Sequence, residues 1–262
     1  MPNVDIEVIA PLVSSIFFYT IVLAVAEASR RILDQVLSKK SILYRFLIEF
    51  IGTAQICTCV FENVVIVQHY GVSSFFIITS VLGVIFGSIN RGSYGTPLAP
   101  IELFHYGEIT LLRFLSIVLA EICGGAIAWK SAKLLWFYSL EYSDAHLQQF
   151  IASQNSCSLN YQREFLLVLA FEIIGSFAMR TVIPRLPEIS GKYLAPAFIS
   201  SLFSFAILFV GDSGLDPVVA SSLFFGCAGL STQWFILLYW ASFIGKKYYI
   251  NDEMKKIFRF VR

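Results

Sequence analysis

Long runs of apolar residues constrain the fold of this chain more than any other feature of its sequence. A helix needs about 20 predominantly apolar residues to cross the hydrocarbon core of a bilayer. Hydrophobic residues make up 57% of the 262 residues and charged residues only 14%, outside the usual balance of a soluble domain. We predict an all-α membrane protein with seven hydrophobic helices, at residues 8–29, 43–67, 72–91, 110–137, 164–184, 192–210 and 232–250.

The charge balance and the motifs argue against several classes of function. The net charge of +1 gives no basic field that would recruit nucleic acid. No nucleophile elbow, phosphate-binding glycine loop or zinc-ligand spacing is present, and the three histidines are scattered along the chain. We therefore expect no enzymatic activity, no cofactor and no metal site. Four of the five cysteines lie inside apolar runs, so we also expect that disulfides do not form the scaffold.

Basic residues predict how the chain is oriented in the membrane. The first apolar run has acidic residues before it and Arg30 and Arg31 after it, so it is a retained helix and not a signal peptide. It either spans the membrane fully or lies at the interface. Of the 19 Lys and Arg residues, 16 fall on one side, which we assign to the cytosol. The tail is then cytosolic, and the loop 138–162 faces the lumen or the exterior.

Two shorter apolar segments, 97–105 and 217–227, are too short to cross the membrane. Thr96-Pro97 opens the first segment and Asp216-Pro217 opens the second. Thr and Asp are suitable N-cap residues, and Pro suits the first helical position, so each pair predicts the start of a helix. We interpret both segments as half-helices that re-enter the membrane from opposite sides.

The chain also contains an internal repeat. Glu49 opens the sequence Glu-Phe-Ile-Gly-Thr and lies 48 residues before the first half-helix Pro, and Glu172 opens Glu-Ile-Ile-Gly-Ser and lies 45 residues before the second. Residues 119–124 and 240–245 match in the same way. Three spans in each half force the halves into opposite orientations, as in many transport proteins.

The repeat divides the chain into parts. Residues 1–42 form an extra N-terminal membrane helix with a basic cytosolic linker, 43–137 the first repeat, 138–162 the connecting loop, 163–250 the second repeat and 251–262 a cytosolic tail.

Two re-entrant half-helices imply a pore. Irregular backbone at membrane depth is tolerated only where it is buried in protein or lines a wet cavity. The positive ends of the half-helix dipoles would repel cations, which favours a small, neutral permeant that forms hydrogen bonds. Glu49 and Glu172 are either proton-relay groups or structural acceptors for the amides of the adjacent loops, and we predict the structural role. Desolvation and nearby amides act on the protonation of Asp216 in opposite directions.

With these features, residues 43–250 resemble the aquaporin or major intrinsic protein family. Members of that family carry Asn-Pro-Ala twice, whereas this chain has Thr96-Pro97-Leu98 and Asp216-Pro217-Val218. The chain is most similar to the unorthodox or superaquaporin branch, of the aquaporin eleven and twelve type. The similarity to this branch rests on the run Gln-Ile-Cys-Thr-Cys-Val-Phe-Glu at 55–62, on the extra N-terminal helix, and on Cys227 nine residues after Val218.

The resemblance implies a passive channel for water or small neutral solutes such as glycerol or hydrogen peroxide. It also implies a homotetramer embedded in membrane lipid, in the endoplasmic reticulum or the plasma membrane. The family's selectivity filter falls at Phe76, Ser204, Ser213 and Val219. Most members have Arg at the position of Val219, and its loss widens the constriction and removes a fixed positive charge.

Pro100 is a further departure, because it has no amide hydrogen to donate to the carbonyl of Thr96. We expect this carbonyl and the Asp216 side chain to offer acceptors, which favours permeants that donate hydrogen bonds. The main alternative is an aquaporin-fold protein with little conduction that acts through partners in an organelle membrane. A seven-helix receptor fits the span count but leaves the internal repeat unexplained.

Overall fold

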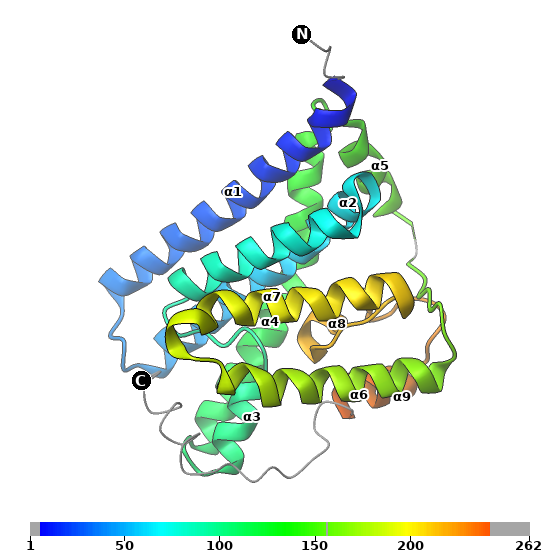
Figure 1. Cartoon of the computed structure of the whole chain (residues 1–262). Coiled ribbons are helices and arrows are strands. Elements are labelled where there is room, and N and C mark those ends of the chain that lie inside the picture. The colour runs from blue at the N-terminus through cyan, green and yellow to red at the C-terminus, as the bar shows by residue number, and fades with distance from the viewer. Residues whose placement is uncertain (1–5, 156, 242–262) are drawn as a thin grey trace.

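The computed structural model describes residues 6–155 and 157–241, which form helices joined by loops (Figure 1). The elements are α1 (Ile6–Val36), α2 (Ile42–Ile89), α3 (Leu98–His105), α4 (Leu111–Ser139), α5 (Asp144–Ala152), α6 (Phe165–Val182), a 3₁₀ turn (Ile183–Arg185), α7 (Glu188–Phe209), α8 (Pro217–Phe224), α9 (Thr232–Phe235) and a π-helical segment (Ile236–Ala241). Within the described ranges, five helices (α1, α2, α4, α6 and α7) are long and apolar enough to cross a membrane.

Helix α2 contains two of the predicted spans. Its helical geometry is broken at Gly71, where φ is 76° and ψ is 177°, a conformation that glycine adopts readily. Gly52, before the break, lies against Phe86, after it, so the two segments run side by side in opposite directions. The predicted separation into 43–67 and 72–91 is therefore confirmed. The predicted last span, 232–250, lies partly outside the described residues.

The outer surface of the bundle is apolar. On α6, Leu166 and Ile174 are 73% and 64% exposed, and on α1 Phe17 is 64% exposed. Large exposed apolar side chains in such number suit contact with lipid and not with water.

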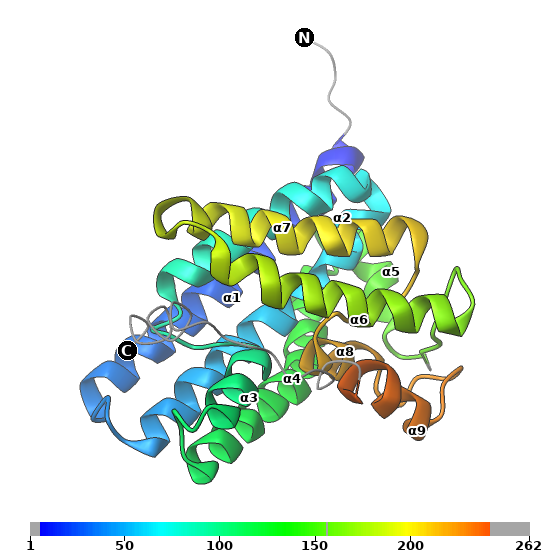
Figure 2. The ribbon, with the colours of Figure 1, turned by 60° about the horizontal axis from the view of Figure 1, so that its bottom comes forward.

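Helix α1 runs beside α2 in both ribbon views (Figure 1, Figure 2). A buried polar cluster joins them, which we call the Glu62 cluster. Glu62, on α2, accepts hydrogen bonds from Ser15 of α1 and, at 2.7 Å, from Trp136 Nε1 of α4. Its carboxylate also pairs with His146 Nε2 of α5 at 2.8 Å. These four side chains are fully buried. The cluster therefore connects four helices at one point, and α1 is an integral part of the bundle.

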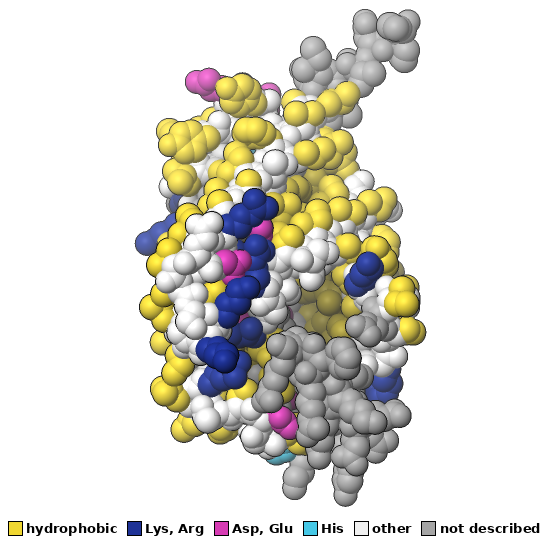
Figure 3. Space-filling view, turned by 90° about the vertical axis from the view of Figure 1, so that its left-hand side faces the viewer, with side chains coloured by type: hydrophobic (Ala, Val, Ile, Leu, Met, Phe, Trp, Pro, Cys, Tyr) yellow, Lys and Arg dark blue, Asp and Glu magenta, His cyan; other side chains and the backbone are white. Residues whose placement is uncertain are grey.

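A second set of contacts joins the C-terminal end of α1 to the loop after α2. Arg91 Nη2 lies 2.8 Å from Glu27 Oε1, and Arg91 Nε lies 3.1 Å from Asp34 Oδ2. The hydrogen bond to Glu27 raises the pKa of Arg91 above its ordinary value. Figure 3 shows basic and acidic side chains gathered in a band on one face of the molecule. The contacts of Arg91 with Glu27 and Asp34 tie α1 to the loop that leads into the first half-helix.

Helix α5 was not expected from the sequence, which predicted only a loop at 138–162. It packs on α4, and Lys133 Nζ donates a hydrogen bond of 3.0 Å to the carbonyl of Ser153 just after it. His146, for which the sequence predicts no role, is buried in this helix.

Replacing Glu62 tests whether the Glu62 cluster holds α1 in place. Glu62→Ala leaves the three buried partners without their common acceptor, and we expect the free energy of unfolding to fall by about 3–5 kcal/mol. The measurement is thermal unfolding of the detergent-purified protein, followed by tryptophan fluorescence. Glu141→Ala, which removes an exposed glutamate, is the control and should change little. Equal melting of the two variants would show that the cluster does not stabilise the bundle.

Candidate pore site

The two half-helices, α3 and α8, begin close to each other. The Thr96 hydroxyl, just before α3, is hydrogen-bonded to the carboxyl group of Asp216, which begins α8. Each half-helix has eight residues, too few to cross a bilayer. Their first turns therefore meet inside the protein.

The two helix starts differ in how they are capped. Asp216 caps α8 as the sequence predicts, because its Oδ1 accepts hydrogen bonds from the amides of Val218 at 2.8 Å and Val219 at 2.9 Å. Pro217 is the first helical residue. The prediction for the first half-helix was wrong by one residue: the N-cap position is Pro97, and Thr96 Oγ1 only accepts a long 3.4 Å bond from the amide of Leu98. The Thr96 hydroxyl instead donates its hydrogen to the carboxyl group of Asp216.

Glu49 holds the loop before α3. Its Oε2 accepts hydrogen bonds from Ser93 Oγ at 2.8 Å, from the amide of Tyr94 at 2.9 Å and from the amide of Gly95 at 3.4 Å. Glu49 is fully buried. The carboxylate therefore satisfies backbone donors that have no helix or sheet partner at this depth.

Glu172 does the same for the loop before α8. It accepts hydrogen bonds from Ser213 Oγ at 2.7 Å and from the amides of Gly214 at 3.0 Å and Leu215 at 2.9 Å. The donors match position by position those that Glu49 receives, which extends the repeat from the sequence into the hydrogen bonds. In both loops the third donor comes from a residue in the left-handed region, Gly95 at φ 66° and Leu215 at φ 49°. For leucine this costs roughly 1–2 kcal/mol.

A glycine three residues after each glutamate lets the loop approach. A Cβ atom on Gly52 would collide with the side chain of Ser93, and one on Gly175 would collide with Leu215. The Glu-x-x-Gly pattern thus combines an acceptor for the loop with the space that the loop needs.

The first half has one additional charge. Arg45 Nη2 lies 2.7 Å from Glu49 Oε1 and 2.6 Å from the carbonyl of Gly92, and its guanidinium group lies over the ring of Tyr94. Four residues before Glu172 the corresponding residue is Val168. The first loop is therefore held by a carboxylate and a cation, whereas the second is held by a carboxylate.

The predicted filter residues lie on three helices and on the loop before α8. Ser213 donates its hydroxyl hydrogen to Glu172, and Val219 is buried on α8 in an apolar cluster that includes Val218. Phe76, on the second segment of α2, and Ser204, on α7, are partly buried on helices that pack against each other. The hydroxyl oxygen of Ser204 is buried without a hydrogen-bond partner in the described part of the chain.

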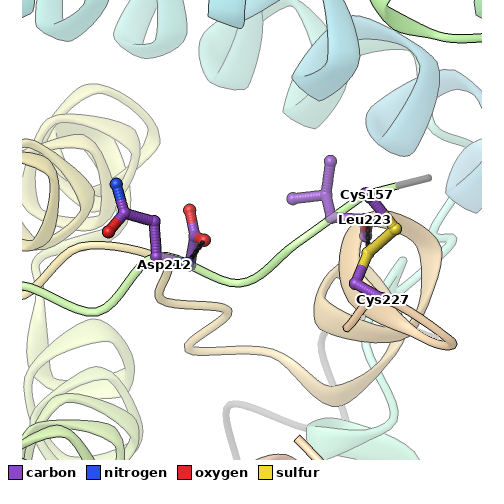
Figure 4. The surroundings of a disulfide bond; sticks show 5 residues. Cys157, Asp212, Leu223 and Cys227 are labelled. Carbon is purple, nitrogen blue, oxygen red and sulfur yellow. Dashed lines mark hydrogen bonds between the residues drawn. A yellow bond between two sulfur atoms is a disulfide. The ribbon is translucent and has the colours of Figure 1, made fainter. Parts of the chain in front are cut away.

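A disulfide joins Cys157 to Cys227, with 4.8 Å between the Cα atoms (Figure 4). The expectation that disulfides do not form the scaffold gave no indication of this cross-link, which joins the connecting loop to the loop after α8. Cys227 follows α8 at the end of an apolar run, in the loop that leaves the half-helix, and so it can meet a cysteine of the connecting loop. Closing 70 residues in this way contributes roughly 4 kcal/mol through the entropy of the unfolded chain.

Backbone hydrogen bonds continue the attachment of the connecting loop. The amide of Ala228 donates to the carbonyl of Cys157 at 2.9 Å, and the amide of Asn160 donates to the Asp212 carboxylate at 2.6 Å. Burial raises the pKa of Asp212. The connecting loop therefore lies against both ends of the segment that carries α8. A disulfide also agrees with the predicted placement of this loop in an oxidising compartment.

Comparisons with known proteins give two relatives that match most of the chain. Putative aquaporin-10 of Caenorhabditis elegans is 37% identical over 242 residues, which cover 92% of this chain and 85% of that protein. Aquaporin-11 of Milnesium tardigradum is 27% identical over 237 residues, which cover 88% of this chain and 82% of that protein. No family model matches the sequence.

The disulfide gives a testable prediction. We expect Cys157→Ser to lower the melting temperature of the purified protein, and we expect a reducing agent to lower the melting temperature of the unchanged protein to the same value, because both remove the same cross-link. Cys123→Ser, which replaces a free cysteine of α4, is the matched control and should keep the response to the reducing agent. A Cys157→Ser variant that melts like the unchanged protein would contradict the prediction.

Proposed function

The chain belongs to the aquaporin family and is a membrane channel for water or small solutes; on that premise we propose that it passes water, glycerol and hydrogen peroxide down their gradients through a pore in each protomer of a homotetramer. The observation that carries the proposal is the meeting of α3 and α8 through Thr96 and Asp216. It brings the positive ends of two half-helices to one place inside the protein.

The side chains around this junction favour neutral solutes with an apolar part. Val219 supplies no charge and no donors where most members of the family have Arg. A valine leaves more room than an arginine and does not hold a polar solute in one orientation. Glycerol, with its carbon backbone and three hydroxyl groups, suits such a constriction as well as water does.

Some hydrogen-bond acceptors at the junction are used by donors of the protein, and others are left for the permeant. Asp216 uses its carboxylate for two amides of α8 and for Thr96. An asparagine could cap the helix with its side-chain oxygen in the same way. We therefore assign the free acceptor to the Thr96 carbonyl, because it precedes the N-cap residue Pro97, whose carbonyl accepts the first hydrogen bond of α3, and because Pro100 has no amide hydrogen to donate to it.

A second candidate function is an aquaporin-fold protein with little conduction that acts through partners in an organelle membrane. The apolar surroundings of the half-helix favour it, since Val218 and Val219 belong to one buried cluster with Phe61 and Trp136. A continuous apolar contact at the start of α8 would oppose the passage of polar solutes. The similarity to the superaquaporin branch suggests the endoplasmic reticulum as the membrane for either function.

Reconstitution into liposomes decides between the two candidates. We expect stopped-flow light scattering to show water and glycerol permeability several-fold above that of empty liposomes, with peroxide entry measured by an enclosed dye. Val219→Trp should abolish transport by filling the constriction. Leu166→Trp, which places the same side chain on the exposed face of α6, is the control and should conduct normally. No transport of any solute by protein shown to be folded and tetrameric would support the second candidate.

A further inference from the structure

A third buried glutamate, Glu121 on α4, has no part in holding either loop. Its side chain is fully buried, and both of its carboxylate oxygens lack a hydrogen-bond partner among the residues that the structure describes. Glu49 and Glu172, by contrast, each receive three donors. An acidic side chain buried without donors inside a membrane protein is costly and is a functional candidate.

The charges that act on Glu121 come from two neighbouring elements. Glu49 and Arg45 belong to α2, and Asp216 begins α8. Gly124, one turn after Glu121, packs directly on the backbone of α2 at Phe50, so the two helices are in close contact here. Three acids therefore share one cation, and that cation is already paired with Glu49.

The three acids differ in the number of hydrogen-bond donors that they receive. Asp216 receives two amides and a hydroxyl group, and Glu49 receives two amides, a hydroxyl group and an arginine. Glu121 receives no donor from the described residues. A carboxyl group that binds a proton brings its own donor, which an ionised carboxylate does not have.

Further polar atoms without a hydrogen bond lie on the facing side of α2. Within the described part of the chain they are Thr53 Oγ1, Arg45 Nε and Glu49 Oε1, of which Glu49 Oε1 lies 2.7 Å from Arg45 Nη2 in an ion pair. Arg45, Glu49 and Thr53 are spaced by four residues and so lie in a row along one face of the helix. The side chain of Arg45 is 18% exposed, so the row starts near the protein surface, on the side that the sequence predicts to be cytosolic. In the second half, by contrast, the hydroxyl group of Ser176, at the position of Thr53, donates a hydrogen bond to the carbonyl of Leu215.

We propose that Glu121 is a proton-binding site, reached from the cytosolic side along the row formed by Arg45, Glu49 and Thr53. The reaction is the gain of one proton by the carboxylate, with the formation of one O–H bond and the loss of one negative charge. Water molecules in the row carry the proton, because a buried water needs two to four polar partners and the row offers them. A metal ion fits this site less well than a proton does, since no group of three metal-binding side chains occurs in the described residues.

The site has a consequence for conduction, and this part rests on the proposed function. When Glu121 loses its proton, an unpaired negative charge stands near Asp216 and Glu49, and like charges repel. The junction of the half-helices is disturbed, so permeability should fall as the pH on the cytosolic side rises.

Infrared difference spectroscopy tests the proton site without any need for transport. We expect the purified protein to show the carbonyl band of a protonated carboxylic acid, which shifts in heavy water and disappears as the pH is raised. Glu121→Gln should lose this band, because the amide has nearly the same shape but cannot ionise. Glu141→Gln, at an exposed glutamate, is the matched control and should retain it. Identical carboxylic acid bands in Glu121→Gln and the unchanged protein at every pH would overturn the proposal.

Liposome assays test the consequence for conduction. Permeability of the unchanged protein should fall several-fold as the pH rises, and Glu121→Gln should stay at the high value throughout. The same pH dependence in both proteins would overturn the link between the site and conduction. Absence of transport from both proteins, with the infrared band lost in Glu121→Gln, would refute the proposed channel and leave the proton site established.

Discussion

The hydrogen bonds from two buried glutamates to two loops are the interaction on which the rest of the structure depends. A half-helix inside a membrane must be preceded by irregular backbone, whose amides have neither water nor a helix to bond to. Glu49 and Glu172 each supply one carboxylate for a hydroxyl group and two amides. Without these acceptors the half-helices could not begin at this depth, and their meeting through Thr96 and Asp216 would be lost.

The two halves share this plan but are supported from opposite sides. The first loop is strengthened by Arg45 and, through Arg91, by the acidic end of α1. The second loop is held from the other side by the connecting loop and its disulfide between Cys157 and Cys227. The extra N-terminal helix and the connecting loop, which lie outside the repeat, therefore carry out equivalent tasks for the two half-helices.

The sequence predicts the repeated part of the fold well, because repetition exposes positions with the same physical task. Glu49 and Glu172 were found by their spacing to the half-helix prolines, and Asp216 was found because a cap is a local signal. Contacts between distant segments leave no such pattern. The pair of Glu62 and His146 joins residues 84 apart, and neither residue belongs to a repeated motif. The disulfide and the use of Thr96 by Asp216 were missed for the same reason.

The substitutions at the junction show which positions the architecture controls. Asp216 can replace an asparagine because the helix start requires only an oxygen acceptor, and both side chains have one. The architecture places no comparable demand on Val219, whose side chain lies in an apolar cluster, or on Glu121, whose carboxylate makes no hydrogen bond to either loop among the described residues. Residues without a structural role of this kind can vary and so determine solute selectivity and proton binding. Differences in solute choice and proton response between this channel and its relatives should therefore follow these two positions and not the glutamates that hold the loops.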